Sequence, residues 1–312
     1  MVVKDNPLVS ITVNCFNGEA FLRAALDSII SQSYENWEVI FWDNQSTDQS
    51  ANIFLSYDED RFRYFYAPSH TVQYEARNCA VDQAGGDFIA FLDVDDLWSP
   101  EKLAMQIPLF QDVEVGLIYC KCWALNESSN VSHKMHKDDL PTGWVLSQLV
   151  KQYFLVLSSL VVRKSAFYSM EGGFDSELNI VGDMDFFIRL AINWKLDCAK
   201  EELVVYRLHG DNLGQNQRDT HAREYIKVVK KFRENEFINQ LAELDDLENE
   251  LIYVNGQRYI IKRNIKMALI SIHRLPWGKF KFKLIILLVV PRALLGWLRR
   301  KAGHYFSPAL EK

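Results

Sequence analysis

The chain has few cysteines, glycines and prolines, and it has no long apolar run free of charge. Its 312 residues include 5 Cys, 14 Gly and 8 Pro, which excludes a collagen-like chain and a small disulfide-stapled scaffold. No stretch of about 18 residues is both apolar and uncharged, as a conventional membrane-spanning helix requires. The chain begins with MVVKDNPLVS, which has neither the apolar core nor the small-residue cleavage site of a signal peptide. We therefore expect a cytoplasmic protein.

The composition is otherwise typical of a folded globular chain. Hydrophobic residues make up 48% of the sequence and charged residues 24%, which excludes intrinsic disorder as the dominant state. The five cysteines are odd in number and lack the spacing of a disulfide framework, which favours a reducing compartment. The length suits one large α/β domain, or a domain of about 200–230 residues with an appendage.

Positive charge is concentrated near the C-terminus. The net charge is −6, yet residues 258–301 contain 12 Lys or Arg and no Asp or Glu, so the remainder carries −18. The apolar run Leu284–Val290 inside this segment is seven residues long, too short to span a bilayer. Flanked by basic residues and by Trp277 and Trp297, it is typical of a segment that lies in a membrane interface.

We therefore expect residues 275–302 to bind an anionic membrane, at the inner face of the plasma membrane, or an anionic lipid-linked acceptor. Two alternatives remain open, namely packing of the segment on the catalytic domain and packing on a second copy of the chain in a homo-oligomer. We do not expect nucleic-acid binding, because the rest of the chain is acidic and contains no recognised motif.

Strand and helix patterns alternate over the first 110 residues or so. Short β-branched and aromatic runs predict four strands, and helical spacing of apolar residues follows each of the first three: 8–13, 37–42, 62–66 and 88–92. This alternation predicts βαβ units and a mostly parallel sheet with helices on both faces. Two helix starts are predicted as well, a capping box at Ser46 and Gln49 and an N-cap at Ser99 before Pro100.

The remainder of the chain is less regular. We expect further strands at 115–125, 155–163 and 202–207, and helices at 142–152 and 183–194. Beyond them the chain reads as helical, first acidic over 217–250 and then increasingly basic. The sequence thus predicts a catalytic domain over 1–215 and a helical extension with a basic amphipathic tail over 216–312.

Acidic side chains gather where the predicted strands end. Asp43 follows the second strand, and Asp93 and Asp95 follow the fourth in FLDVDDLW. Carboxylates this close repel each other unless a cation neutralises them, and Mg²⁺ and Mn²⁺ prefer such oxygen ligands. Isolated acids of this kind often only cap helices, but at the carboxyl edge of a parallel sheet they lie where ligands bind. The sequence therefore predicts a divalent-metal site.

Glycine-rich phosphate loops are absent. The sequence contains no G-x-G-x-x-G after the first strand and no G-x-x-x-x-G-K-[ST]. The phosphates of a nucleotide would then need the metal held by Asp93 and Asp95. Asp43 could accept hydrogen bonds from a base or a ribose hydroxyl.

Five sequence motifs that follow one another in a fixed order resemble those of a known protein family. PLVSITVNCFN, EVIFWDNQSTD, EARNCAVDQAGGDFIAFLDVDD, GGFDSEL followed by GDMDFFIRLA, and YRLHG together resemble family-2 inverting glycosyltransferases of bacteria. The resemblance covers roughly residues 6–212. It implies the Rossmann-like GT-A fold, a metal-dependent hexosyltransferase activity and a nucleotide-sugar donor, with a UDP-sugar favoured. It also implies a glycan or lipid-linked acceptor in surface polysaccharide synthesis.

The resemblance also implies roles for individual residues. It assigns the nucleotide-sugar to Asn17, Asp43, Arg77, Asn78 and Asp93, and the metal to Asp95 with Asp93, with His209 as an additional metal or phosphate ligand.

The resemblance places the general base at Asp183, the Asp of the family's Glu-Asp pair, although this chain has Gly182 in place of the Glu. Asp185 is the second choice, because Gly182-Asp183-Met184-Asp185 offers two carboxylates.

The chemistry needs one displacement at the anomeric carbon. The metal would stabilise the departing diphosphate while a carboxylate takes the proton of the acceptor hydroxyl. Two other classes compete, a sugar-phosphate nucleotidyltransferase and a non-catalytic glycan- or membrane-binding module. The first usually has a basic residue just after the first strand, where this chain has none before Arg23; the second would have lost the paired acids.

Overall fold

The computed structural model describes residues 6–136, 138–210, 212 and 217–289. The chain divides into two compact units, Met1–Val228 and Val229–Lys312. The expected domain boundary between 215 and 216 lies outside the described residues. In the structure the chain passes from the first unit to the second within helix α9, Arg218–Glu234.

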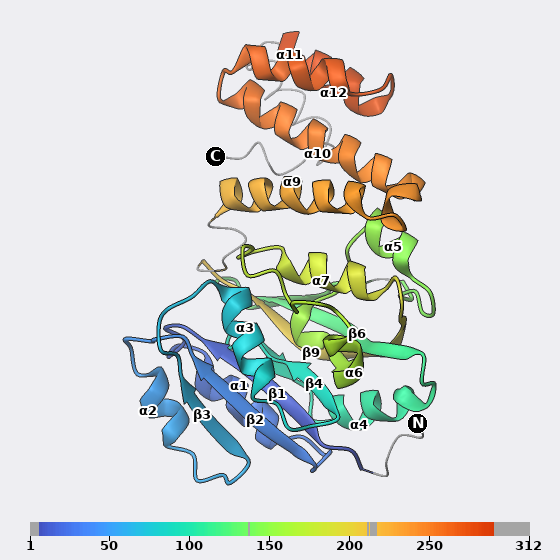
Figure 1. Ribbon diagram of the computed structural model, residues 1–312. Coiled ribbons are helices and arrows are strands. Elements are labelled where there is room, and N and C mark those ends of the chain that lie inside the picture. The colour runs from blue at the N-terminus through green and yellow to red at the C-terminus, as the bar shows by residue number, and fades with distance from the viewer. Residues whose placement is uncertain (1–5, 137, 211, 213–216, 290–312) are drawn as a thin grey trace. The chain divides into compact units, whose positions relative to one another are not determined.

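The first half of the first unit is the expected parallel sheet with its connecting helices (Figure 1). Four strands pair in parallel in the order β3-β2-β1-β4: β1 Val9–Cys15, β2 Trp37–Asp43, β3 Phe62–Tyr66 and β4 Phe88–Phe91. Three helices connect them in sequence: α1 Leu22–Ile30, α2 Ser50–Leu55 and α3 Gln73–Asp82. The carboxyl ends of β1, β2 and β4 therefore meet at one edge.

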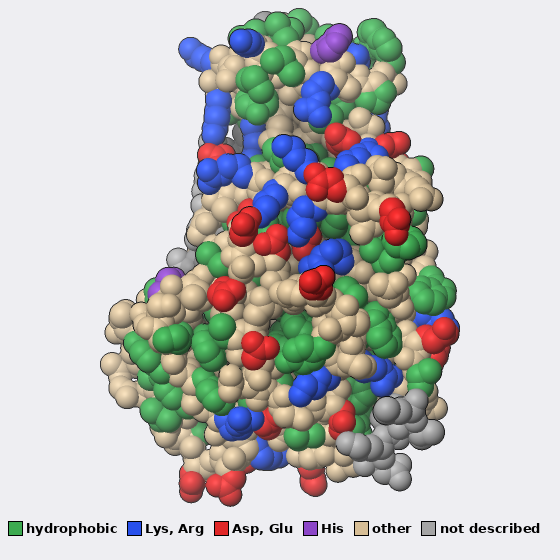
Figure 2. Space-filling view, viewed as in Figure 1, with side chains coloured by type: hydrophobic (Ala, Val, Ile, Leu, Met, Phe, Trp, Pro, Cys, Tyr) green, Lys and Arg blue, Asp and Glu red, His purple; other side chains and the backbone are tan. Residues whose placement is uncertain are grey.

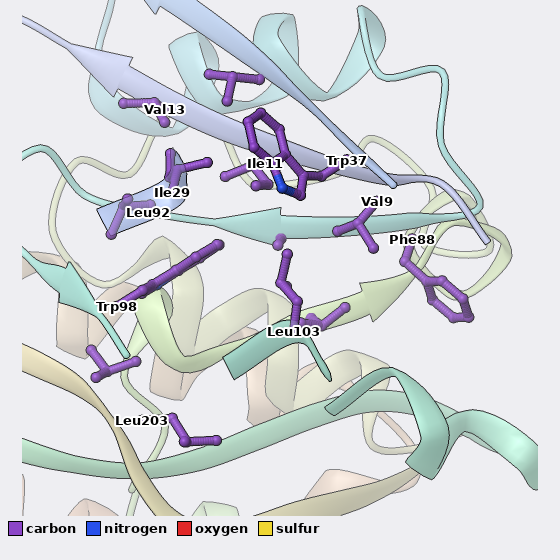
Figure 3. Packing of buried hydrophobic residues seen from close by; sticks show 14 of the residues in the cluster. Val9, Ile11, Val13, Ile29, Trp37, Phe88, Leu92, Trp98, Leu103 and Leu203 are labelled. Atoms are coloured by element: carbon purple, nitrogen blue, oxygen red, sulfur yellow. The ribbon is translucent and has the colours of Figure 1, made fainter. Parts of the chain in front are cut away.

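Alternation along β2 shows why helices cover both faces. Val39 and Phe41 belong to the main core with α1 and α2, whereas Ile40 and Trp42 pack with Ala76 of α3. Successive strand residues point to opposite faces, so a continuous apolar strand needs a helix on each side. Figure 3 shows the main core, in which side chains of β1, α1 and the chain after β4 pack together.

The second half of the sheet is mixed. Within the described residues the sheet has nine strands, which continue from β4 through β8, β6, β9 and β5, with β7 beside β6. Only the β6–β9 pair is parallel here, and the other pairs are antiparallel. The bounds are β5 Leu97–Trp98, β6 Val115–Asn126, β7 Val131–Lys134, β8 Val161–Arg163 and β9 Lys195–Leu208.

Short helices connect these strands. They are α4 Lys102–Gln106, η1 Ile107–Gln111, α5 Leu146–Lys151, η2 Leu157–Ser159, α6 Lys164–Tyr168 and α7 Gly182–Leu190. The strand expected over 155–163 is therefore a 3₁₀ turn followed by β8. The GT-A class expected from the sequence, an α/β sheet flanked by helices, is confirmed, with the sheet parallel over β1–β4 and mixed beyond them.

Both predicted helix starts are wrong in detail. Helix α2 begins at Ser50 and α4 at Lys102, and neither has a side-chain cap. The Ser46 hydroxyl instead accepts a hydrogen bond from the Asn17 backbone N–H at 3.0 Å. The Ser46 hydroxyl therefore binds the loop after β1 and does not cap α2, because tertiary contacts compete with local ones for the same hydroxyl.

The second unit is helical, as expected. It contains the end of α9, then η3 Ile238–Gln240, α10 Ala242–Ile261, α11 Ile265–Arg274 and α12 Lys279–Val289. Tyr253, Leu275, Leu284 and Leu287 form its core. The stretch 217–250, expected to be helical, contains α9, η3 and the first part of α10. The expected membrane-binding segment, 275–302, is described only up to residue 289.

Candidate active site

Three carboxylates follow β4 at the carboxyl edge of the sheet. Asp93, Asp95 and Asp96 each offer an oxygen, and these oxygens lie within 4.8 Å of one another. Asp93 and Asp95 are partly exposed, whereas Asp96 is buried. Such a group of hard oxygen ligands fits a divalent cation.

Asp96 has a structural role in this group. Its Oδ2 accepts a hydrogen bond from the Ser158 hydroxyl at 2.5 Å, and its Oδ1 accepts one from the Arg207 backbone N–H at 3.1 Å. Burial and the charges of Asp95 and Asp93 hold the pKa of Asp96 well above its usual range. Asp93 and Asp95 are therefore the carboxylates that face outward to a ligand.

Asp95 lies beside the last motif of the sequence. His209 Nε2 is 2.9 Å from its Oδ2, and the Asn212 amide nitrogen is 3.5 Å from the same oxygen. Burial, followed by the charge of Asp93, raises the pKa of Asp95, and the hydrogen bond to His209 opposes this rise. The structure thus brings His209 to the acidic group, as a third-ligand role would require.

Arg77 is the cation nearest to Asp93. Its guanidinium lies 2.6 Å from Asp93 Oδ1, and its side chain is only 4% exposed. The predicted contact of Arg77 with a nucleotide is not tested by these contacts, which show Arg77 fixing Asp93 instead. One oxygen of Asp93 is therefore oriented before any ligand arrives.

Asp43 and Asn17 shape the loop after β2. The buried Asp43 carboxylate accepts hydrogen bonds from the Ser46 backbone N–H and the Tyr64 hydroxyl, both at 2.7 Å. Asn17, in a left-handed conformation at φ 56°, accepts one from the Thr47 backbone N–H at 2.8 Å. Their contacts with a donor nucleotide stay predictions, and what the structure shows is that both stand at the expected edge.

Asn78 is engaged elsewhere in the unit. Its amide accepts a hydrogen bond from the Phe174 backbone N–H at 2.9 Å and donates one to the Phe174 carbonyl at 2.8 Å. The side chain thereby holds the segment before α7. Nucleotide binding by Asn78 stays a prediction that these contacts do not support.

The two candidate bases at the start of α7 differ in their surroundings. Asp185 is fully buried and forms an ion pair with Arg189 at 2.9 Å, one helical turn later. Asp183 is partly exposed and accepts hydrogen bonds from the Tyr74 hydroxyl at 2.8 Å and the Tyr153 hydroxyl at 3.1 Å. Burial raises the pKa of Asp183, and hydrogen bonding to Tyr74 and the charge of Arg77 oppose the rise. The geometry favours Asp183, because Asp185 is enclosed with its cation.

The loop before Asp183 is tied to helix α9. The Glu224 carboxylate accepts hydrogen bonds from three successive backbone N–H groups, at 3.0, 2.7 and 3.2 Å: those of Asn179, Ile180 and Val181. This anchor fixes the residues that lead into α7.

Sequence reasoning missed several of these residues. Tyr74 lies three positions before Arg77, so helical spacing could have placed both on one face. Asn212 lies three positions after His209 in a polar segment. Tyr153 and Glu224 carry no local signal, because only the fold brings Tyr153 to Asp183 and Glu224 to the loop before Asp183.

Comparison with solved structures supports the fold. The chain is similar to residues 1–349 of Staphylococcus aureus TarS bound to UDP-GlcNAc, with a TM-score of 0.67, 17% identity, and coverage of 90% of this chain and 81% of that one. It is also similar to the mannosyltransferase PcManGT of Pyrobaculum calidifontis, in complex with GDP-Man and Mn²⁺. There the TM-score is 0.63 at 16% identity, covering 99% and 84% of the two chains.

Curated relatives are glycosyltransferases. An uncharacterised glycosyltransferase of Rickettsia typhi is 26% identical over 246 residues, 75% of each chain. The Escherichia coli UDP-Glc:alpha-D-GlcNAc-diphosphoundecaprenol beta-1,3-glucosyltransferase WfgD is 34% identical over 127 residues, which are 41% of this chain and 50% of that protein.

The family model for "Glycosyl transferase family 2" matches residues 10–167. These residues make up half of the chain and include β1 from its second residue, all of β2–β4, the acidic group and Arg77. The family expected from the five motifs is thus confirmed, and the chain belongs to glycosyltransferase family 2.

Proposed function

We propose that the chain transfers a sugar from a nucleotide-sugar, most simply a UDP-sugar, to a hydroxyl acceptor with inversion at the anomeric carbon. The observation that carries the proposal is the carboxylate group of Asp93, Asp95 and Asp96 at the carboxyl end of β4, with Arg77 against Asp93. Family membership argues against the nucleotidyltransferase and the non-catalytic module as competing functions.

Asp95 and Asp93 would hold Mn²⁺ or Mg²⁺, with His209 beside Asp95 as a further ligand. The fit rests on the donor set, two partly exposed carboxylates whose repulsion a cation would relieve. When bound, such a metal supplies positive charge for the departing diphosphate. Arg77 orients Asp93, and Asp96 holds the loop through Ser158 and the Arg207 backbone.

Asp183 would act as the general base. A partly exposed carboxylate that accepts two phenolic hydrogen bonds can take the proton of an acceptor hydroxyl while that oxygen attacks the anomeric carbon. A single displacement inverts the carbon and requires no covalent sugar–enzyme intermediate.

We further propose that the second unit binds the inner face of an anionic membrane, where a lipid-linked acceptor would reside. WfgD, by its name, acts on a diphosphoundecaprenol-linked sugar. Helices α11 and α12 and the turn between them contain no acid and expose apolar side chains among Lys and Arg (Figure 2). Leu269 of α11 is 51% exposed, Trp277 of the turn 83% and Phe282 of α12 62%. Basic residues near anionic lipid contribute about 1 kcal/mol each. Among the described helices none has the length and apolarity needed to cross a bilayer.

A donor screen tests the transferase proposal. Purified protein is incubated with Mn²⁺ and a panel of UDP-, GDP- and dTDP-sugars, and nucleotide release and thermal shift are measured. We expect a Mn²⁺-dependent response to a UDP-sugar that Asp95→Asn abolishes and that Asp58→Asn, in the exposed connection between α2 and β3, preserves. A response to UDP-sugar that is independent of metal and equal in both variants would refute the metal-dependent mechanism.

Liposome sedimentation tests the membrane proposal. We expect the protein to bind phosphatidylglycerol vesicles at low salt and the double variant Trp277→Ser/Phe282→Ser to lose binding. Trp144→Ser removes a 55% exposed tryptophan of the first unit and is the matched control. Point variants are preferable to truncation after Ile272, which would remove Leu275, Leu284 and Leu287 from the core of the second unit. Equal binding by both variants would contradict the proposal.

A further inference from the structure

The side chain of Tyr74 explains why residue 182 is glycine. A Cβ built on Gly182 would lie 2.5, 2.6 and 2.7 Å from three ring carbons of Tyr74: Cδ2, Cγ and Cε2. These atoms belong to a rigid ring that is 3% exposed, so they cannot swing away as the end of a flexible chain could. Because residue 182 has no side chain, the ring of Tyr74 can pack directly against the first residue of α7.

The ring delivers a hydroxyl to the proposed base. Tyr74 Oη is 2.8 Å from Asp183 Oδ1 and 3.2 Å from the Ile180 carbonyl oxygen. One proton serves both acceptors, and the shorter contact is the one to the carboxylate, which makes the stronger hydrogen bond when ionised. Arg77 lies over the same ring, 4.9 Å from its centroid.

A second hydroxyl arrives from an unrelated segment. Tyr153 follows α5, and its Oη is 3.1 Å from Asp183 Oδ2. Each oxygen of the Asp183 carboxylate thus accepts one hydrogen bond from a tyrosine hydroxyl, and the two tyrosines are far apart in the sequence. Burial and the charge of Asp183 hold the pKa of both phenols well above the usual range, so both act as donors.

We propose that Tyr74 and Tyr153 are positioning residues for Asp183, in place of the acidic neighbour that the family pattern has at position 182. The proposal rests on the proposed function, in which Asp183 is the general base. Two donors fix the plane of the carboxylate, so that its remaining lone pairs face the acceptor hydroxyl. They also stabilise the ionised form, which is the form that can take a proton.

The other groups that face Asp183 do not replace the two phenols. Arg77 on α3 contributes positive charge, and Tyr206 on β9 lies close enough for the charge of Asp183 to contribute to the rise in its pKa. The described hydrogen bonds from side chains to the Asp183 carboxylate come from Tyr74 and Tyr153.

The test is the pH profile of Tyr74→Phe, Tyr153→Phe and the double variant. Each variant keeps its aromatic ring and loses only a hydroxyl, and Tyr74→Phe therefore keeps the packing against Gly182. Turnover is measured as UDP release from the UDP-sugar selected by the donor screen, from pH 5 to 9, and UDP–Mn²⁺ affinity is measured by calorimetry. Tyr57→Phe is the matched control, because Tyr57 donates to the Asp27 carboxylate at 2.6 Å on α1.

We expect kcat at pH 7 to fall roughly 10- to 100-fold for each single variant, the scale of a hydrogen bond to a charged group. Loss of a donor raises the pKa of Asp183, so the acidic limb of the profile moves to higher pH while UDP affinity stays within about twofold. The control matches the wild type. A merely structural role would lower kcat equally at every pH.

The outcomes separate this inference from the proposal on which it rests. If Asp183→Asn is inactive but the tyrosine variants keep the wild-type profile, or lose rate equally at all pH values, the positioning role is wrong and the base assignment stands. If Asp183→Asn turns over like the wild type, both are wrong, while loss of donor binding in Asp95→Asn would still support the metal site.

Discussion

Gly182→Ala is the substitution for which the structure makes the most specific prediction. Its Cβ would approach Tyr74 ring carbons to 2.5 Å, whereas carbons in contact are about 3.5–4.0 Å apart, so the ring must move by about 1 Å. The hydroxyl at the end of the ring, now 2.8 Å from Asp183 Oδ1, would leave hydrogen-bond distance. We therefore expect both stability and turnover to fall.

Two opposing terms set the size of the effect. Overpacking of a well-filled site typically destabilises by about 1–3 kcal/mol. Replacing glycine by alanine in a helix stabilises by at most about 1 kcal/mol, and by less in the first turn, where Gly182 lies. The clash therefore dominates, with a net loss of about 1–2 kcal/mol in the free energy of unfolding. For a unit of this size Tm falls by roughly 2–8 °C.

A double-mutant cycle with Tyr74→Ala isolates the contact. Without the ring, Gly182→Ala keeps its gain in helix propensity and loses its clash, so we expect it to become neutral or stabilising. Calorimetric Tm values and denaturant midpoints are measured for all four proteins. If Gly182→Ala has the same effect in both backgrounds, with a coupling below about 0.5 kcal/mol, the explanation for glycine at 182 is refuted.

Four further predictions concern the charges of the site and of the second unit. Asp95→Asn should abolish Mn²⁺-dependent UDP binding in calorimetry without unfolding the protein, and retained affinity would sink the metal assignment. Asp183→Asn should lower kcat by roughly 10²–10⁴ and leave donor affinity intact. The same variant should be more stable than the wild type at neutral pH. Burial raises the pKa of Asp183 in the folded protein above its value in the unfolded chain. The wild type therefore has its full stability below the unfolded-state pKa of this carboxyl and loses part of it as the pH rises through the folded-state pKa, whereas the Asn variant does not. Melting curves should therefore converge near pH 4 and separate at pH 7–8, and parallel curves would contradict the desolvation of Asp183. Binding to phosphatidylglycerol vesicles should weaken at 0.5 M relative to 0.05 M salt without vanishing, since screening acts on Lys and Arg but not on Trp277 and Phe282; unchanged sedimentation would argue against an electrostatic contribution.

The parallel half of the sheet and the acidic group could be predicted because their signals are local. Apolar strands alternate with helical patterns, and Asp93 and Asp95 follow β4 directly, so strand polarity alone places them at the ligand-binding edge. The strands of the mixed half were harder to predict from the sequence. For example, β8 has only three residues and follows a 3₁₀ turn within the same apolar run, so the two could not be told apart.

The family resemblance favoured Asp183 over Asp185, but the local sequence pattern could not separate the two. Both lie in the first turn of α7, where acidic residues are favoured in any case. Tertiary contacts separate them: Arg189 neutralises Asp185, and two tyrosines from distant segments reach Asp183. The sequence showed that Gly182 departs from the family pattern, but the cause, the close approach of the Tyr74 ring on α3, is seen only in the structure.

The anchoring of the loop by Glu224 has a consequence for amide hydrogen exchange. Loop amides usually exchange quickly, yet those of residues 179–181 are all donated to one carboxylate that is 9% exposed. They should exchange as slowly as amides inside a helix, and together, because release of one side chain frees all three. The segment leading to Asp183 would then open as a single cooperative unit with the first turns of α9, and Glu224→Gln would accelerate its exchange before that of the sheet.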